Sequence, residues 1–229
     1  FENLRLGKDG IVYLLDFEKK SNFVLVYSLS DGKVLTAYDS KVLIFSPLGI
    51  EEVNTKDKKS NVKIKKDQDW GDILGFSTFG GNLYLLDKKS SKIWRYPAGG
   101  EDYGIKKSWI AENQPDLSFS VSFVIDGSIW ILTKDSILKF NSGKQENFSL
   151  SKMPEKFENP VKIYTSVNCQ NLYVLDKGRG KIYVISKTGE FKTSYAGESI
   201  KQTDDLAAIE PLKKIFLLSG SKILEIGMR

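Results

Sequence analysis

Residues Asn171–Phe191 read NLYVLDKGRGKIYVISKTGEF, two short apolar runs separated by a polar turn that contains glycine. Both runs are rich in β-branched and aromatic residues, which favour strands. The runs start 10 residues apart, at Leu172 and Ile182. Two such runs joined by a short Gly-containing turn are typical of a β-hairpin.

Segments similar to NLYVLD recur along the chain at spacings of 49, 46, 43 and 43 residues. They are Lys33–Tyr38 (KVLTAY, the loosest match), Asn82–Asp87 (NLYLLD), Ser128–Thr133 (SIWILT) and Lys214–Ser219 (KIFLLS). Each is followed by a second apolar run, as in the hairpin above. These second runs are Val42–Phe45, Ile93–Tyr96, Ile137–Phe140, Ile182–Ile185 and Ile223–Ile226. A nearly fixed period of this size indicates a supersecondary repeat.

The sequence between successive hairpins contains candidates for two more strands in each repeat. A strand rich in small and hydroxyl residues precedes the first run. The candidates are Phe23–Leu29, Ile73–Phe79, Phe119–Ile125, Lys162–Val167 and Asp205–Ile209. A more polar strand follows the second run, at Gly104–Ala111, Lys144–Ser151 and Gly189–Ala196. Radial repetition of four-stranded antiparallel units predicts an all-β fold, the β-propeller.

Five blades are predicted in a single domain over residues 1–229. Their approximate limits are 22–66, 72–111, 118–151, 161–196, and 205–229 completed by 11–17. The last repeat ends before an outer strand, so we expect Ile11–Phe17 to pair with it and close the ring, because an open ring leaves an apolar edge exposed. The alternative is six blades, with Val12–Asp16 and Val24–Tyr27 as the hairpin of an additional blade.

The stretch Asn171–Phe191 resembles the NHL repeat, in which an apolar strand ends in Asp before a short polar turn, and Asn82–Tyr96 matches it less fully. Thr133 and Ser219 replace that Asp in two other repeats. The chain is similarly close to TolB and YWTD propellers. The phrases GNLYLLD, GSIWIL and KKIFLLSGSKI also resemble the C-terminal propeller of uncharacterised bacterial proteins with an upstream PPM-type phosphatase-like domain. That resemblance implies the non-catalytic part of a sensor or regulator.

Composition excludes several kinds of chemistry. The chain has 34 Lys and Arg, 29 Asp and Glu, a formal charge of +5, one Cys and no His. Without imidazole there is no Ser-His-Asp triad and no His-ligated zinc. A single Cys excludes an internal disulfide. The longest apolar runs are far shorter than the ~20 residues that span a bilayer, so no membrane span is predicted.

Acidic residues recur in the loops just before the inner strands, at what we expect to be the ligand-binding top face. They are Asp72, Asp116, Glu158, Asp204 and Asp205. Lactonase-like propellers use acidic residues and Asn around calcium, and Asn113, Asn159 and Asn168 lie nearby. If a metal binds, we expect Asp72, Asp116, Asn159 and Asp205 to hold it, as oxygen ligands hold calcium. We favour loop capping over metal binding, and assign no cofactor and no catalytic residue.

Asp87 and Asp176 lie where the first hairpin strand enters its turn. Both could contribute to a calcium site, but a short polar side chain entering a turn caps backbone N–H groups, and Thr or Ser can do the same. We therefore predict a structural role. Trp70, in a loop before an inner strand, and Arg179, in a hairpin turn, are our further candidates for ligand contact.

The segment Lys56–Lys66 (KDKKSNVKIKK) contains six lysines, which is compatible with RNA binding. Only Arg5, Arg95, Arg179 and Arg229 are arginine, however, and planar recognition of bases and phosphates favours arginine. Lysine on an outer strand also protects a sheet edge from aggregation. We favour this protective role over binding of nucleic acid.

These features predict a non-enzymatic binding or interaction module that recognises a protein or a small molecule at the top-face loops. The chain begins with Phe1 rather than Met, so we expect a monomeric domain of a longer polypeptide, and favour an extracytoplasmic part of a bacterial protein. The alternatives are a calcium-dependent lactonase or hydrolase and an RNA-binding protein.

Overall fold

The computed structural model describes residues 3–6, 11–16, 23–28, 41–46, 48–54, 59–100, 102–111, 115–219 and 222–229. Their regular secondary structure is almost entirely strand, with one α-helical turn, α1 (Glu198–Lys201), and one 3₁₀ turn, Glu210–Leu212. They form two compact units. The larger comprises Gln68–Gln202, Ala208–Lys214 and Met228–Arg229, and the smaller comprises Phe1–Asp67, Thr203–Ala207 and Ile215–Gly227.

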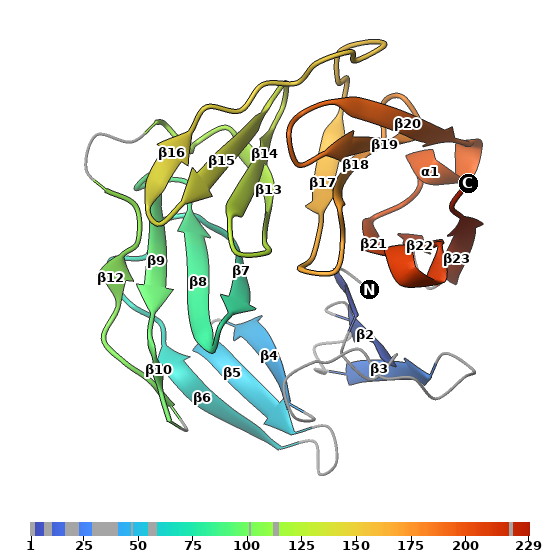
Figure 1. Ribbon diagram of the computed structural model, residues 1–229. Helices are drawn as coiled ribbons and strands as arrows, with labels where there is room; N and C mark the ends of the chain where they lie inside the picture. The colour runs from blue at the N-terminus through green and yellow to red at the C-terminus, as the bar shows by residue number, and fades with distance from the viewer. Residues whose placement is uncertain are drawn as a thin grey trace. The chain divides into compact units, whose positions relative to one another are not determined.

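The larger unit contains three four-stranded antiparallel sheets, the blades of Figure 1. We name each blade after its second strand. The β8 blade consists of β7 (Ile73–Phe79), β8 (Asn82–Asp87), β9 (Lys92–Tyr96) and β12 (Lys107–Ser108). The β14 blade consists of β13 (Ser120–Ile125), β14 (Ile129–Thr133), β15 (Ile137–Asn141) and β16 (Lys144–Glu146). The β18 blade consists of β17 (Pro160–Tyr164), β18 (Asn171–Asp176), β19 (Lys181–Ser186) and β20 (Phe191–Ala196).

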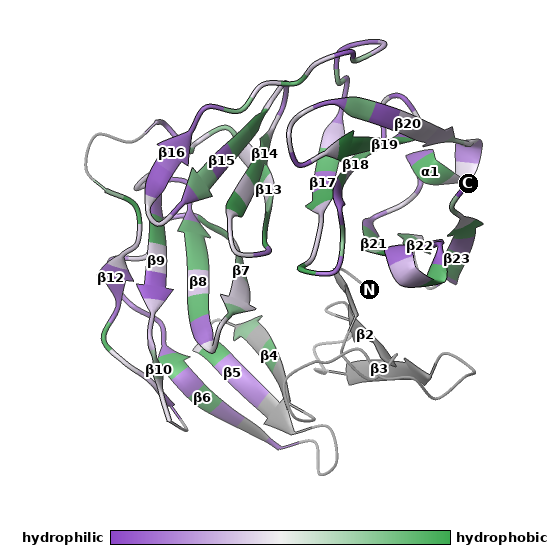
Figure 2. Ribbon diagram, viewed as in Figure 1, coloured by the Kyte–Doolittle hydropathy of each residue, from purple (hydrophilic) through white to green (hydrophobic). Residues whose placement is uncertain are grey.

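The core of this unit lies between the blades. Successive side chains of a strand point to opposite faces, so β14 packs against two neighbours at once. Ile129 and Ile131 share a cluster with Tyr84 of the β8 blade, whereas Trp130 shares a cluster with Tyr183 of the β18 blade. The inner strand β13 likewise contacts both β7 and β17. Figure 2 shows hydrophobic residues along β14 and hydrophilic ones along the outer strand β16. The all-β fold of four-stranded antiparallel blades is therefore confirmed.

The remaining described strands form smaller antiparallel sheets. Three have three strands and one is a two-stranded ribbon. They are β1 (Asn3–Leu6), β2 (Ile11–Asp16) and β3 (Phe23–Ser28); β4 (Lys41–Ser46), β5 (Gly49–Asn54) and β6 (Ser60–Lys65); β21 (Asp205–Ile209), β22 (Lys214–Ser219) and β23 (Lys222–Gly227); and the ribbon β10 (Ala98–Gly99) and β11 (Asp102–Tyr103).

The predicted closure by Ile11–Phe17 is wrong. Strand β2 lies between β1 and β3, and its Leu14 is paired with Leu4 on one side and with Leu25 on the other. A strand with both edges occupied cannot complete another sheet. The β2–β3 hairpin is the one that the six-blade alternative expected. Lys33–Tyr38 lies outside the described residues, and a single domain over residues 1–229 with the stated blade limits remains a prediction.

Candidate functional site

The loops before the inner strands and the turns after the second strands lie at one end of each blade, because neighbouring strands are antiparallel. We call this the top end. In the β8 blade, the Asp87 carboxylate accepts hydrogen bonds from the backbone N–H groups of Gly71 (2.9 Å), Asp72 (3.0 Å) and Ser90 (3.3 Å). Asp87 is fully buried. One side chain thus fastens the inner-strand loop to the turn.

Asp176 does the same in the β18 blade. Its carboxylate accepts from the N–H groups of Glu158 (2.8 Å), Asn159 (2.9 Å) and Arg179 (3.1 Å). Asp176 is also fully buried. The predicted capping role of the two aspartates is confirmed.

The hydrogen bonds also set the charge of Asp87. Burial raises the pKa of this carboxyl, but the Gly71 N–H, the Ser90 side chain and the N–H groups of Asp72 and Ser90 together lower it by more, so its pKa lies below the usual value. Asp87 is therefore ionised at neutral pH, with its negative charge held by backbone dipoles.

The β14 blade fixes its top end differently. Thr133 stands at the position of the aspartates, and its hydroxyl accepts from the N–H of Ser136 (3.0 Å). The loop before β13 is held by Asp116, whose carboxylate accepts from the N–H of Ser118 (2.8 Å) and from the hydroxyl of Ser91 (3.1 Å). Because Ser91 belongs to the turn of the β8 blade, Asp116 connects two neighbouring blades.

A charged cluster borders the Asp176 turn. It consists of Glu155, Glu158, Arg179, Lys181 and Tyr183. The Arg179 Nε lies 3.3 Å from a Glu158 oxygen and 3.6 Å from a Glu155 oxygen. The Tyr183 hydroxyl donates to Glu155 at 2.9 Å. Hydrogen bonds from Lys181 and Tyr183 lower the pKa of Glu155, while burial and then this hydrogen bond raise the pKa of Tyr183 well above its usual range.

The predicted site residues fall into separate places. Asp72 and Asp116 border the Asp87 turn, and Asn159 and Arg179 border the Asp176 turn. Asp72 is exposed, with its carboxylate 3.8 Å from Lys88 Nζ. Asp205 is 1% exposed and belongs to the other unit, where its carboxylate accepts from the N–H of Leu206.

Trp70 is 8% exposed and packs edge-on against Tyr96, to whose hydroxyl its indole N–H donates at 2.9 Å. Its contact with a ligand stays a prediction, but little of the ring is accessible.

The other predicted metal and nucleic-acid features do not assemble into a site within the described part of the chain. No group of three or more His, Cys, Asp or Glu side chains there could hold a metal ion. Asn113 lies outside the described residues, and Asn168 lies at the opposite end of its blade. Strand β6, which belongs to the lysine-rich segment, is an edge strand of the sheet β4-β5-β6. This position is the one that the predicted protective role requires. The described helices include none that is long and apolar enough to cross a membrane.

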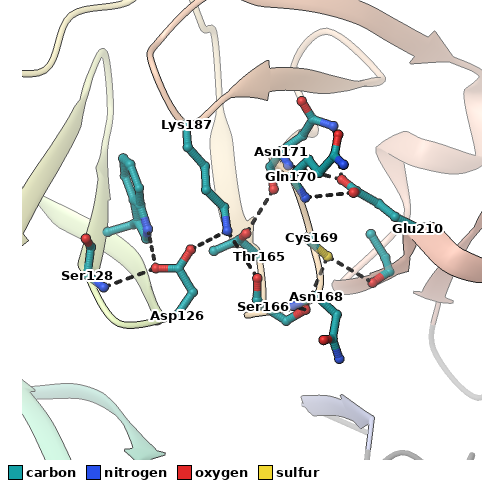
Figure 3. A network of polar contacts seen from close by, with 12 residues as sticks. Asp126, Ser128, Thr165, Ser166, Asn168, Cys169, Gln170, Asn171, Lys187 and Glu210 are labelled. Carbon is teal, nitrogen blue, oxygen red and sulfur yellow. Dashed lines mark hydrogen bonds and ion pairs between the residues drawn. The ribbon is translucent and has the colours of Figure 1, made fainter.

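Sequence reasoning missed a second polar network, at the end of the blades opposite the top end (Figure 3). Lys187 Nζ lies 2.6 Å from the Asp126 carboxylate of the neighbouring β14 blade and donates to the Ser166 carbonyl at 3.2 Å. Glu210, in the 3₁₀ turn, accepts from the N–H of Gln170 (2.7 Å) and from the Tyr173 hydroxyl (2.9 Å). Asp126, Lys187 and Glu210 lie outside the repeated NLYVLD-like segments, so no sequence signal marked them.

Cys169 lies in the same network and is buried. Its thiol donates to the Ala208 carbonyl at 3.5 Å, and burial raises its pKa. The thiol is therefore protonated at neutral pH, as is typical of a buried cysteine in a structural role.

No family model matches the sequence, and no curated protein matches it. Solved structures do. Virginiamycin B lyase from Staphylococcus aureus is 16% identical, with a TM-score of 0.53 over 99% of this chain and 83% of that one. Regucalcin, described as a calcium-binding protein, from Agrobacterium tumefaciens is 15% identical, with a TM-score of 0.58 over 91% and 74%. A chain of the nidogen/laminin complex is 13% identical, with a TM-score of 0.57 over 86% and 80%. The similarity to these solved structures supports a β-propeller fold.

Proposed function

We propose that this chain is a non-enzymatic binding module of a longer protein and that it recognises a protein or a small molecule with the top-end loops. One observation carries the proposal. Asp87 and Asp176 fasten equivalent loops in the same way, whereas the side chains that those loops present are different. The β8 blade presents Asp72 and Lys88, and the β18 blade presents Glu158 and Arg179.

Such an arrangement suits recognition. Loops on a rigid scaffold are the usual carriers of binding residues. A loop that is already fixed by three hydrogen bonds loses less conformational entropy when a partner binds, so more of the contact energy contributes to affinity. The nidogen/laminin structure gives a fold relative that is part of a protein complex.

The carboxylates at the top end are engaged in holding the fold. Asp87, Asp116 and Asp176 each accept at least two hydrogen bonds from the protein itself. A general acid or base must instead reach the proton that it transfers. This favours binding over hydrolysis as the activity of this end of the molecule.

The proposal is tested by site-specific photo-cross-linking in the full-length protein, in its own cells. The cross-linker replaces Asp72 or Glu158 at the top end, and Asn168 at the opposite end serves as the matched exposed control. We expect one discrete adduct from the top-end positions, none from position 168, and loss of the Glu158-position adduct when Arg179→Ala is added.

Equal adducts from both ends, or none from the top end, would contradict the proposal. Calcium-dependent turnover of a lactone by the purified protein would favour the hydrolase instead.

A further inference from the structure

A pocket on the flank of the β8 blade lies away from the Asp87 turn, toward the other end of β9. Its volume is about 630 Å³. The described residues that line it are Arg95, Pro97, Lys107, Ser108, Trp109 and Ser142. Two of these are cations, and none is acidic. The pocket lies within the larger unit, between strands of the β8 blade and the turn after β15 of the β14 blade.

The two cations are direct neighbours. Arg95 of β9 and Lys107 of β12 are partners in the antiparallel pairing, so both side chains leave the same face of the sheet. Like charges directly opposite each other destabilise a strand pair. Within the described part of the chain, neither Arg95 nor Lys107 forms an ion pair with a carboxylate, and the Arg95 guanidinium donates from Nη2 to the Asn82 side-chain oxygen at 3.2 Å.

The Arg95 side chain also has an unused donor. Its Nε is buried and has no hydrogen-bond partner among the described residues. A buried donor without an acceptor destabilises the folded state. Arg95 and Lys107 therefore leave positive charge at this pocket without a counter-charge from the described residues.

The wall beside the cations is apolar and fixed. Trp109 is partly buried and packs edge-on against Tyr84, with ring centroids 6.0 Å apart. The Trp109 N–H donates to the Ile93 carbonyl at 2.7 Å, which holds the backbone of this residue against β9. Pro97 lines the same pocket. A ring or a short aliphatic group of a ligand would pack against Trp109 and Pro97.

We propose that this pocket binds a small organic oxyanion, with a carboxylate or phosphate group at Arg95 and Lys107 and an apolar part against Trp109 and Pro97. Arginine suits this chemistry because its planar guanidinium donates two parallel hydrogen bonds to either group. The anion neutralises the cross-strand repulsion between Arg95 and Lys107. This site is separate from the top-end loops, so its failure would leave the proposed function standing.

Isothermal titration calorimetry with four probes tests the proposal: phenyl phosphate, benzoate, inorganic phosphate and uncharged benzyl alcohol. We expect saturable binding of phenyl phosphate or benzoate, weaker binding of inorganic phosphate, and none of benzyl alcohol. Comparison of the first two shows which oxyanion the pocket prefers. Lys107→Gln and Arg95→Gln should each raise the dissociation constant tenfold or more. Lys134→Gln, which changes an exposed lysine in another turn, should leave it unchanged.

Thermal unfolding provides a readout that does not depend on affinity. Without ligand, Lys107→Gln should melt no lower than the wild type, because it removes a like-charge contact. Phenyl phosphate or benzoate, whichever binds, should raise the melting temperature of the wild type and of Lys134→Gln, but not of Lys107→Gln. The absence of saturable binding of every oxyanion, or equal dissociation constants for all variants, would overturn the proposal.

Discussion

Single carboxylates fix whole loops in this protein, and Asp176 is the clearest case. Asp176→Ala leaves the N–H groups of Glu158, Asn159 and Arg179 without their acceptor. Since hydrogen bonds to a charged group contribute about 1.5–3 kcal/mol, we expect a loss of about 3 kcal/mol in the free energy of unfolding, measured by urea denaturation. Asp72→Ala, at an exposed carboxylate, should cost less than about 0.5 kcal/mol. Similar losses in the two variants would contradict the capping role.

Glu190 gives a pH-dependent prediction. Lys152 and then Lys192 lower the pKa of its carboxyl from 4.5 to about 2. A carboxyl whose pKa is lower in the folded state stabilises the fold above the unfolded-state pKa and loses that contribution as the pH falls through the folded-state pKa. Wild type and Glu190→Gln should therefore differ in stability at pH 6 and converge between pH 4.5 and about 2. A difference that is constant over this range would refute the assignment.

Sequence reasoning succeeded at the residue scale where a feature is repeated. Asp87 and Asp176 occupy the same point of two repeats, and the period itself indicated their capping role. It did not indicate that Trp70 is buried, because its hydrogen-bond partner Tyr96 is 26 residues away along the chain. Glu210 was missed for the same reason, since the groups that donate to its carboxylate, the Gln170 N–H and the Tyr173 hydroxyl, lie 40 and 37 residues away along the chain.

At the scale of strands, the second strand of each described blade was predicted well because it is buried on both faces and reads as a continuous apolar run. The same feature explains the failure at Ile11–Phe17. Ile11–Asp16 reads IVYLLD, an apolar run that ends in Asp, as NLYVLD does at Asn171–Asp176. That pattern is typical of a strand with partners on both sides, which β2 has, and not of a closing outer strand. The apolar pattern of a run therefore predicts the place of its strand in a sheet better than the position of the run along the chain does.

Two glycines test how closely the connecting turns pack. Gly189 has a φ of +95° and Gly100 a φ of +79°. A Cβ at Gly189 would lie 2.1 Å from the Ser149 carbonyl oxygen, whereas a Cβ at Gly100 would have no atom within 4 Å. Gly100→Ala should cost about 1–2 kcal/mol from backbone strain alone. Gly189→Ala should cost at least twice as much in urea unfolding, because the turn must also move away from Ser149. Equal costs would mean that the turn has room to adjust.

At the scale of the molecule, the larger unit behaves as a stack in which each blade buries its faces against its neighbours. Trp130 faces the β18 blade, while Ile129 and Ile131 face the β8 blade. In such repeat architectures stability is approximately a sum of blade terms and nearest-neighbour interface terms. The sequence predicted the repeated blades of this stack, because the NLYVLD-like segments recur at a nearly fixed period.

The stacked arrangement predicts which pairs of substitutions interact. Asp87 and Asp176 lie in blades separated by the β14 blade, so the losses caused by Asp87→Ala and Asp176→Ala should add to within about 0.5 kcal/mol. Glu210 and Tyr173 are in direct contact, with their oxygens 2.9 Å apart, and Glu210→Gln combined with Tyr173→Phe should deviate from additivity by more than about 0.5 kcal/mol. Both cycles are measured by urea denaturation of the four proteins that each requires. Strong coupling between Asp87 and Asp176 would show that the three blades unfold through contacts beyond nearest neighbours, because neither carboxylate shares a hydrogen-bond partner with the other.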